Sequence, residues 1–409
     1  MFLMRFTERA YTAYTEEAVR NSPNEAVRLT FSNSNFDPKV GARQYNEYLD
    51  EYEYCEEAGF DGLMLNEHHN TPTCLGATMN LEAAILARNT KKPKIVLMGN
   101  PLPTFENPLR VAEEIAEIDM ISNGRVVSGF VRGTGVESLA ANINPLHNRE
   151  RFEEAHDLLI KIWSEPGPFR WEGNHYQFRV VNPWALPLQK PHPRIWIPGV
   201  SSIETVTWAA EHRYPYICLN TTIQQTQDIW EVYDQAAQRV GYKSGPEQRG
   251  YLIRCHVADT EEKAMKNGRE FMWMLGEFTG LGHPVWFSPP GYSSPESRRR
   301  RAETQVTQRA DPFDKQLENK NIIAGTPDQV IASLKQILEE TRPSILALWG
   351  NDGKVDHKDS MDCIRLMGQE VMPALREIGK DLGLDSPFDV DSPISLAETP
   401  ASELLPVTV

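Results

Sequence analysis

Short runs of apolar and β-branched residues recur along the chain, separated by stretches whose apolar residues stand three and four positions apart. The runs predict strands, and amphipathic stretches such as YNEYLDEYEYCEEAGF and NPLRVAEEIAEIDMISNG predict helices. The eight candidate strands are Met1 to Phe6, Gly62 to Asn66, Lys94 to Gly99, Arg125 to Val131, Arg194 to Gly199, Pro215 to Asn220, Tyr251 to Val257 and Ser344 to Trp349. Eight strands with helices between them predict an α/β fold, a single (β/α)8 TIM barrel, rather than two domains.

Three segments are too long for a minimal barrel and predict insertions after strands 1, 4 and 7. Residues 12–40 form a polar excursion, and residues 165–193 form a proline-rich one. The third segment, about 280–320, contains HPVWFSPPGYSSPESRRRR and is expected to be a lid or disordered. The barrel domain is therefore expected to span 1–380, and the tail 381–409 is expected to be mobile or to wrap a neighbouring subunit.

Charge and cysteine content narrow the expected partners and compartment. The 42 Lys and Arg residues against 57 Asp and Glu residues give a formal charge of −15, which repels phosphate backbones and anionic membrane surfaces. We therefore expect no nucleic-acid partner and no membrane partner. Five scattered cysteines without a CxxC pair favour reduced thiols. The first residues do not have the pattern of a signal peptide, and no stretch approaches 18 apolar residues, so a cytoplasmic protein is expected.

In a barrel of this kind the active site lies at the C-terminal ends of the strands, where this chain carries the motif NEHHN. Neighbouring side chains on an extended strand point to opposite faces, so Glu67, His68 and His69 cannot converge as one chelate. A histidine there can act as acid, base or hydrogen-bond donor, and a nearby carboxylate can fix its tautomer. The alternative is a hydrogen-bonded strand end with one buried histidine. The HxH and HExxH spacings are absent, so we expect no metal ligands.

The sequences at two further strand ends, RGTG and GVSSIET, together predict a phosphate site. In RGTG, Arg132 offers a guanidinium beside glycines, although pairing with Glu137 as plain structure stays open. GVSSIET leads from a strand into a helix through hydroxyl residues, which leaves N–H groups free for an anion. The chain has no Rossmann fingerprint or P-loop, so a phosphate would not be held in those ways. In LMGNPLP, a strand-end glycine lets the backbone approach a flat ligand, although an ordinary turn is the alternative.

Four blocks of sequence, taken in order, resemble the bacterial luciferase-like family of flavin-dependent monooxygenases: GFDGLMLNEHH, IVLMGNPLPTFENPLRVAEEIAEIDMISNGRVVSGFVRG, NRERFEEAHDLLIKIW and IWIPGVSSIETVTWAA. The resemblance implies a (β/α)8 barrel that binds reduced FMN delivered by a separate flavin reductase. It also implies that oxygen adds at the flavin C(4a) atom and that the resulting peroxide oxygenates a small organic substrate. A homodimer or related oligomer is expected.

The resemblance assigns roles to individual residues. His68 matches the family's catalytic histidine, and Glu67 is its neighbour in the same motif. Met98 and Gly99 match the pair that lies against the isoalloxazine ring, where the family often has a non-prolyl cis peptide. The expected flavin contacts are Met98, Gly99, Asn100, Val131, Arg132, Val200, Ser201, Ser202 and Thr205.

The phosphate end follows from the same comparison. Arg132 matches the arginine near the flavin phosphate, and Ser202 and Thr205 match hydroxyl residues that bind it. Ser201 stands where bacterial luciferase has an acidic residue. Val131 stands where luciferase has a reactive cysteine, so light emission is not expected.

Two other functions on the same barrel stay open. One is a dehydrogenase or reductase that uses a deazaflavin, because that branch of the family shares the fold and the phosphate site. The other is a non-catalytic flavin-binding protein, against which the intact EHH motif argues. Aromatic residues such as Trp184, Trp286 and Tyr292 are candidates for lining a substrate pocket, with ordinary packing as the alternative.

Overall fold

Eight parallel strands close into one barrel in the computed structural model, which describes residues 1–21, 27–200, 202–273, 286, 288–292, 294–297, 299 and 312–389. The strands are β1 (Phe2–Thr7), β2 (Gly62–Leu65), β3 (Lys94–Pro101), β4 (Val126–Val131), β7 (Arg194–Gly199), β8 (Tyr216–Cys218), β9 (Arg249–Val257) and β11 (Ile345–Asn351). They follow the order β9-β11-β1-β2-β3-β4-β7-β8, and pairing of β8 with β9 closes the ring. The predicted single barrel is confirmed, with each strand at its predicted place.

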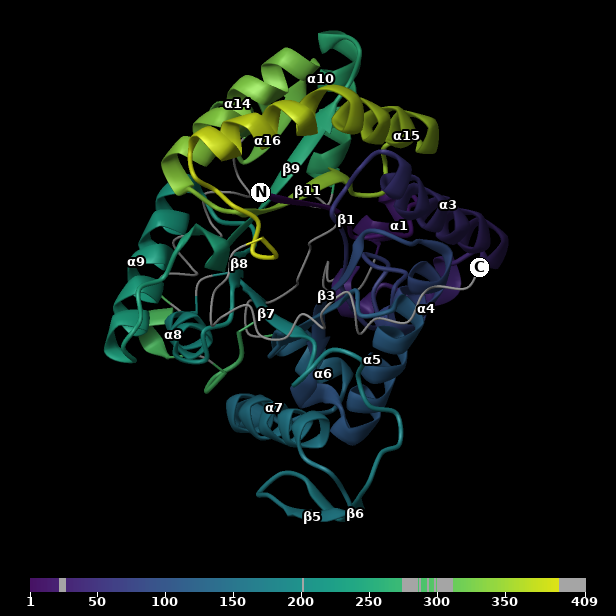
Figure 1. Ribbon diagram of the computed structural model, residues 1–409. Helices are drawn as coiled ribbons and strands as arrows, with labels where there is room; N and C mark the ends of the chain where they lie inside the picture. The colour runs from purple at the N-terminus through teal and green to yellow at the C-terminus, as the bar shows by residue number, and fades with distance from the viewer. Residues whose placement is uncertain are drawn as a thin grey trace.

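Helices lie between the strands and surround the barrel (Figure 1). The longer ones are α3 (Pro38–Glu57), α4 (Met79–Asn89), α5 (Pro108–Ser122), α7 (Asn148–Ser164), α8 (Ile203–Glu211), α9 (Ile223–Arg239), α10 (Glu261–Trp273), α14 (Pro327–Thr341), α15 (His357–Leu366) and α16 (Met372–Asp381). Local sequence sets their ends. Helix α3 begins where the Asp37 carboxylate accepts the Lys39 N–H at 2.8 Å, and α5 ends at Asn123, whose φ of 58° is left-handed.

Short elements complete the chain. They are the helices α1 (Glu16–Arg20), α2 (Val27–Thr30), α6 (Gly135–Ala140) and α13 (Phe313–Glu318), the 3-10 turns η2 (Asn33–Asn35), η3 (Leu102–Thr104), η4 (Pro145–His147) and η5 (Pro246–Gln248), and the π-helical turn η7 (Met367–Val371). The predicted excursion at 12–40 thus contains α1, α2, η2 and the start of α3. A ninth strand in the main sheet, β10 (Ile322–Gly325), pairs with the C-terminal half of β9 outside the barrel, and it was not predicted.

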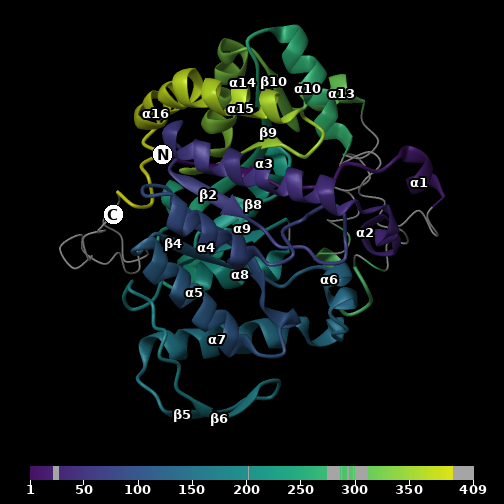
Figure 2. The same cartoon turned by 90° about the vertical axis from the view of Figure 1, so that its right-hand side faces the viewer.

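The proline-rich insertion 165–193 carries an antiparallel hairpin, β5 (Phe169–Glu172) and β6 (Gln177–Val181). Figures 1 and 2 show the hairpin beyond α7, on the outside of the molecule. About half of the predicted lid at about 280–320, and the tail from residue 390, lie outside the described residues, whereas the end of the predicted lid contains α13.

The described start of the predicted tail lies against the N-terminal end of the barrel. The Phe388 ring lies 5.1 Å from Phe2 and 5.9 Å from Trp196, measured between ring centroids. Arg194, at the start of β7, places its guanidinium 4.2 Å from the same ring. Lys94, at the start of β3, also contacts that ring. This end of the barrel is therefore filled by side chains, so a ligand site belongs at the opposite end.

The five cysteines are all buried and free, as the sequence predicted for reduced thiols. Within the part of the chain that the structure describes, no helix combines the length and apolar character needed to cross a bilayer.

Candidate functional site

A cavity opens at the C-terminal ends of the barrel strands. Apolar side chains form much of its wall, namely Phe6, Met64, Met98, Val131, Pro198, Val200, Leu219, Leu252 and Trp349. Polar side chains around it are Glu8, Asn66, Glu67, His68, Arg132, Thr134, Glu137, Ser202, Thr205, Tyr216, Asn220 and Tyr292. Nine of the eleven residues predicted for the site border this cavity. Of the other two, Asn100 does not, and Ser201 lies outside the described residues.

His68 stands between two carboxylates at the cavity edge. Its Nδ1 lies 2.9 Å from Glu137 Oε1, and its Nε2 lies 3.7 Å from Glu8 Oε2. Glu137 also accepts the backbone N–H of Thr134 at 2.9 Å, which completes a capping box at the start of helix α6. The carboxylate that fixes the His68 tautomer is therefore Glu137, in the first turn of α6, rather than Glu67.

Glu67 and His69 bind each other and the protein frame. Glu67 Oε2 accepts the Met79 N–H at 3.0 Å at the start of α4, and its Oε1 lies 2.9 Å from His69 Nε2. The hydrogen bond to Glu67 raises the pKa of His69. Glu67 borders the cavity with both carboxylate oxygens already in use, whereas His69 does not border it. His68 therefore borders the cavity and His69 does not, as the alternation of side chains at an extended strand end predicts.

Strands β3 and β4 come unusually close beside the cavity. The Met98–Gly99 peptide is cis, as the resemblance implied, and the pairing register of β3 with β4 shifts between Leu97 and Asn100. A Cβ atom on Gly99 would lie 2.8 Å from the Gly129 backbone, and one on Gly129 would lie 2.0 Å from the Leu97 carbonyl oxygen. Both positions therefore require glycine for a steric reason.

Asn100 is directed to the helical layer instead of the cavity. Its buried side chain accepts a hydrogen bond from Asn80 at 3.1 Å. The register shift before Asn100 is the physical reason, because it breaks the two-residue alternation that would have kept Asn100 on the Met98 face.

On the opposite side of the cavity, hydroxyl and guanidinium groups form a series of hydrogen bonds. Arg149 donates to Thr205 Oγ1 at 3.2 Å, Thr205 donates to Ser202 Oγ at 3.1 Å, and Ser202 donates to Glu204 at 2.8 Å. Burial, and then the charge of Arg132, lower the pKa of Arg149. Arg149 is a residue that the sequence reasoning missed; its position in the first turn of α7, within the block NRERFEEAHDLLIKIW, was the available signal.

Glu204 and Arg132, at this series of hydrogen bonds, also have other partners. Burial acts to raise the pKa of Glu204, but hydrogen bonds from Ser294, Ser202 and Ser297 lower it to about 2. Arg132 donates to the Tyr292 carbonyl oxygen at 3.0 Å, and its guanidinium lies 4.6 Å from the Tyr292 ring centroid. The described part of the predicted lid thus contacts the cation at the cavity edge.

Comparison with known proteins matches residues 28–344 to the family described as luciferase-like monooxygenase. A Sinorhizobium fredii protein, named uncharacterized protein y4wF, is 30% identical over 48% of this chain, and the match spans 57% of that relative. The oxygenase component of a flavin-dependent trigonelline monooxygenase from Acinetobacter baylyi is 24% identical over 83% of this chain and 92% of its own.

Solved structures share the fold. The oxygenating constituent of 3,6-diketocamphane monooxygenase from Pseudomonas putida, in complex with FMN, has a TM-score of 0.64 at 18% identity, covering 81% of this chain and 93% of its own. An F420-dependent secondary alcohol dehydrogenase has a TM-score of 0.62 at 17% identity, covering 81% and 95%. At these identities the likeness concerns the fold alone.

Proposed function

Because this chain belongs to the luciferase-like monooxygenase family, we propose that it binds reduced FMN in the barrel cavity and uses O2 to oxygenate a small organic substrate. A separate flavin reductase would supply the reduced cofactor, as the name of the trigonelline relative, an oxygenase component, suggests. The observation that carries the proposal is a cavity whose wall combines apolar side chains and His68 with Arg132 and the hydroxyl residues at the start of α8.

The residues present fit a flavin mononucleotide. Met98, Gly99 and Val131 offer a flat, largely apolar wall to a ring system. Arg132 and Arg149 are close enough that one charge lowers the pKa of the other, and a phosphate group bound between them would offset that repulsion. The start of the nine-residue helix α8, which the Ser202 side chain does not cap, presents the positive end of the helix dipole to the same anion.

Bound reduced flavin supplies two electrons to O2, so that one oxygen atom enters the substrate and the other leaves as water. The chain's own part centres on His68. Glu137 holds a proton on Nδ1, which leaves Nε2 to accept a proton, and the Glu8 carboxylate 3.7 Å away stabilises the imidazolium that results. His68 can thus donate a hydrogen bond from Nε2 to a reacting oxygen within a partly water-excluded cavity.

Oxygen uptake tests this function. Protein mixed with chemically reduced FMN should bind it and, with a suitable substrate from a screen, yield product labelled from 18O2. A deazaflavin dehydrogenase is the second candidate, because His68 between two carboxylates also suits proton transfer during hydride transfer and a structural neighbour uses F420. Reduction of F420 by an alcohol, without oxygen uptake, would favour that candidate. Tight FMN binding with neither activity would indicate a flavin-binding protein.

Substitutions at the cationic end should separate phosphate binding from ring binding. Arg132→Ala and Arg149→Ala are each expected to weaken FMN binding by about 1.5 to 3 kcal/mol, since each removes a charge-assisted hydrogen bond. Riboflavin, which has no phosphate, should bind these variants almost as it binds the wild type. Equal losses for both flavins in a fluorescence titration would remove the two arginines from the phosphate site.

A further inference from the structure

Arg254 is a buried guanidinium that the site described above does not use. It lies on β9 two residues after Leu252, which borders the cavity, so the strand alternation directs both side chains to the barrel interior. Arg254 is 6% exposed and places its guanidinium 4.4 Å from the ring centroid of Trp349, another cavity residue. It lines a water-sized hollow together with Asn220 and Leu252, both of which also border the main cavity.

The hydrogen-bonding groups of Arg254 are mostly unused. Nη2 donates to Asn220 Oδ1 at 2.7 Å, and Nε is buried without a hydrogen-bond partner. Within the described part of the chain, no carboxylate forms an ion pair with this guanidinium, although Asp352 and Glu8 lie near enough to act on its pKa. A buried cation with free donors is costly unless an anion binds it.

Asp352, the acid that acts most strongly on the pKa of Arg254, does not fill that role. It is fully buried, and neither of its carboxylate oxygens has a hydrogen-bond partner. Burial raises the pKa of Asp352 well above its usual range, which favours the neutral acid, whereas burial lowers the pKa of Arg254 only to about 10. The shift works against a charged Asp352 carboxylate that would neutralise Arg254.

We propose that Arg254 is the anchor for a carboxylate on the substrate, which selects small organic acids. The planar fork of the guanidinium matches both oxygens of a carboxylate, and the Trp349 ring beside it offers an apolar surface to the rest of the molecule. The inference rests on the proposed function, since it assigns the substrate class of the same cavity.

Paired acids and amides test the anchor without knowledge of the natural substrate. Full-length protein saturated with FMN would be titrated calorimetrically with benzoate against benzamide and with hexanoate against hexanamide. In the wild type at least one acid should bind tenfold or more tightly than its amide. In Arg254→Met that ratio should fall to threefold or less, with FMN affinity unchanged within threefold. The matched control is Arg269→Met, because Arg269 also stacks on an aromatic ring, Phe313, but is exposed on α10.

Each other outcome has a distinct meaning. Wild-type protein that binds no acid better than its amide, or binds none of the four probes, overturns the anchor, and so does an unchanged ratio in Arg254→Met. Should that variant fail to fold, the wild-type comparison still decides, and Arg254→Lys, which keeps the charge without the fork, should show an intermediate ratio. Failure of the wild type to bind FMN would instead count against the proposed function, and the probes would then be titrated into the apoprotein.

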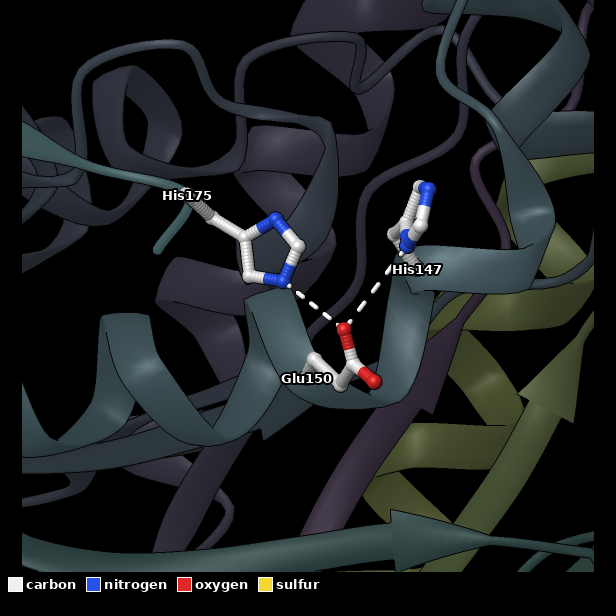
Figure 3. A group of neighbouring side chains, drawn as sticks. All are labelled: His147, Glu150 and His175. Atoms are coloured by element: carbon white, nitrogen blue, oxygen red, sulfur yellow. Dashed lines mark hydrogen bonds and ion pairs between the residues drawn. The ribbon is translucent and has the colours of Figure 1, made fainter. Parts of the chain in front are cut away.

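A second, independent cluster joins the hairpin insertion to the start of α7. His147 Nδ1 and His175 Nε2 both face Glu150 Oε2, at 3.7 and 3.0 Å (Figure 3). The three donor atoms lie within 4.8 Å of one another. His175 is held in place because Glu154 accepts the backbone N–H groups of three consecutive residues in the hairpin turn, at 2.9 to 3.0 Å.

We infer that this cluster is a surface site for a divalent transition metal such as Zn2+, which would fasten the β5–β6 hairpin to α7. Two imidazoles and one carboxylate are a ligand set that Zn2+ accepts, with a fourth position open to water. The sequence did not suggest it, since the hairpin that brings His175 beside residues 147 and 150 was not predicted.

Titration of the full-length protein with Zn2+ tests the site. One ion per chain should bind, and His175→Ala should weaken that binding at least tenfold. Glu172→Gln, in the same hairpin and 65% exposed, is the matched control and should bind as the wild type does. No Zn2+ binding, or binding that His175→Ala leaves unchanged, overturns the site.

Discussion

His68→Ala should lower the rate of product formation by a factor on the order of 10² to 10⁴, the usual loss for a positioned acid or base. The affinity for reduced FMN should stay within about tenfold, roughly 1.4 kcal/mol, because His68 contributes after the cofactor has bound. The physical reason is its position between Glu137 and Glu8, where it can hold a proton at the cavity edge. The measurement is product and hydrogen peroxide per O2 consumed, and the peroxide share should rise.

His69→Ala is the control for this prediction. His69 does not border the cavity and bonds Glu67, so its loss should act through stability rather than through the chemistry. If the His69 variant releases hydrogen peroxide while the His68 variant turns over normally, the two imidazoles have been assigned the wrong way round.

Gly129→Ala should lower the free energy of unfolding by about 3 kcal/mol or more, which is at the upper end for overpacking a core. The added methyl group would lie 2.0 Å from the Leu97 carbonyl oxygen and 2.8 Å from the Met98 sulfur. The carbonyl belongs to a neighbouring barrel strand, so relief requires the two strands to separate. Urea denaturation measures the loss.

Gly59→Ala is the comparison for the barrel glycine. Gly59 has a φ of +83°, and nothing lies within 4 Å of a Cβ placed there, so only the backbone conformation opposes the change, at about 1 kcal/mol. If Gly129→Ala lowers the free energy of unfolding by no more than Gly59→Ala does, then β3 and β4 separate at little cost.

The barrel was predictable because its strands are buried on both faces and therefore appear as continuous apolar runs. The outer hairpin was not, because β5 alternates half-buried and exposed residues, β6 buries only Val181, and the prolines around them suggested a loop. Strand β10 was missed because its four residues pair only with the far half of β9, a contact that no local pattern encodes.

The site shows the same division between local and long-range information. His68 and His69 point to different sides because they are neighbours at one strand end, and this could be predicted from the sequence. The partner of His68 could not be predicted in this way, because Glu137 comes from α6, which follows a different strand. Arg149 was missed for a similar reason, since it reaches the α8 hydroxyl residues from α7.

Glu137 has a consequence for redesign of this enzyme. One oxygen of its carboxylate holds the imidazole of His68, and the other accepts the N–H of Thr134, the residue that caps the start of α6. A substitution made to retune the histidine would also loosen the start of that helix, and the RGTG loop leading into it carries Arg132. Changes of chemistry are therefore easier to introduce at Glu8, which approaches the same imidazole from the end of β1 without capping a helix.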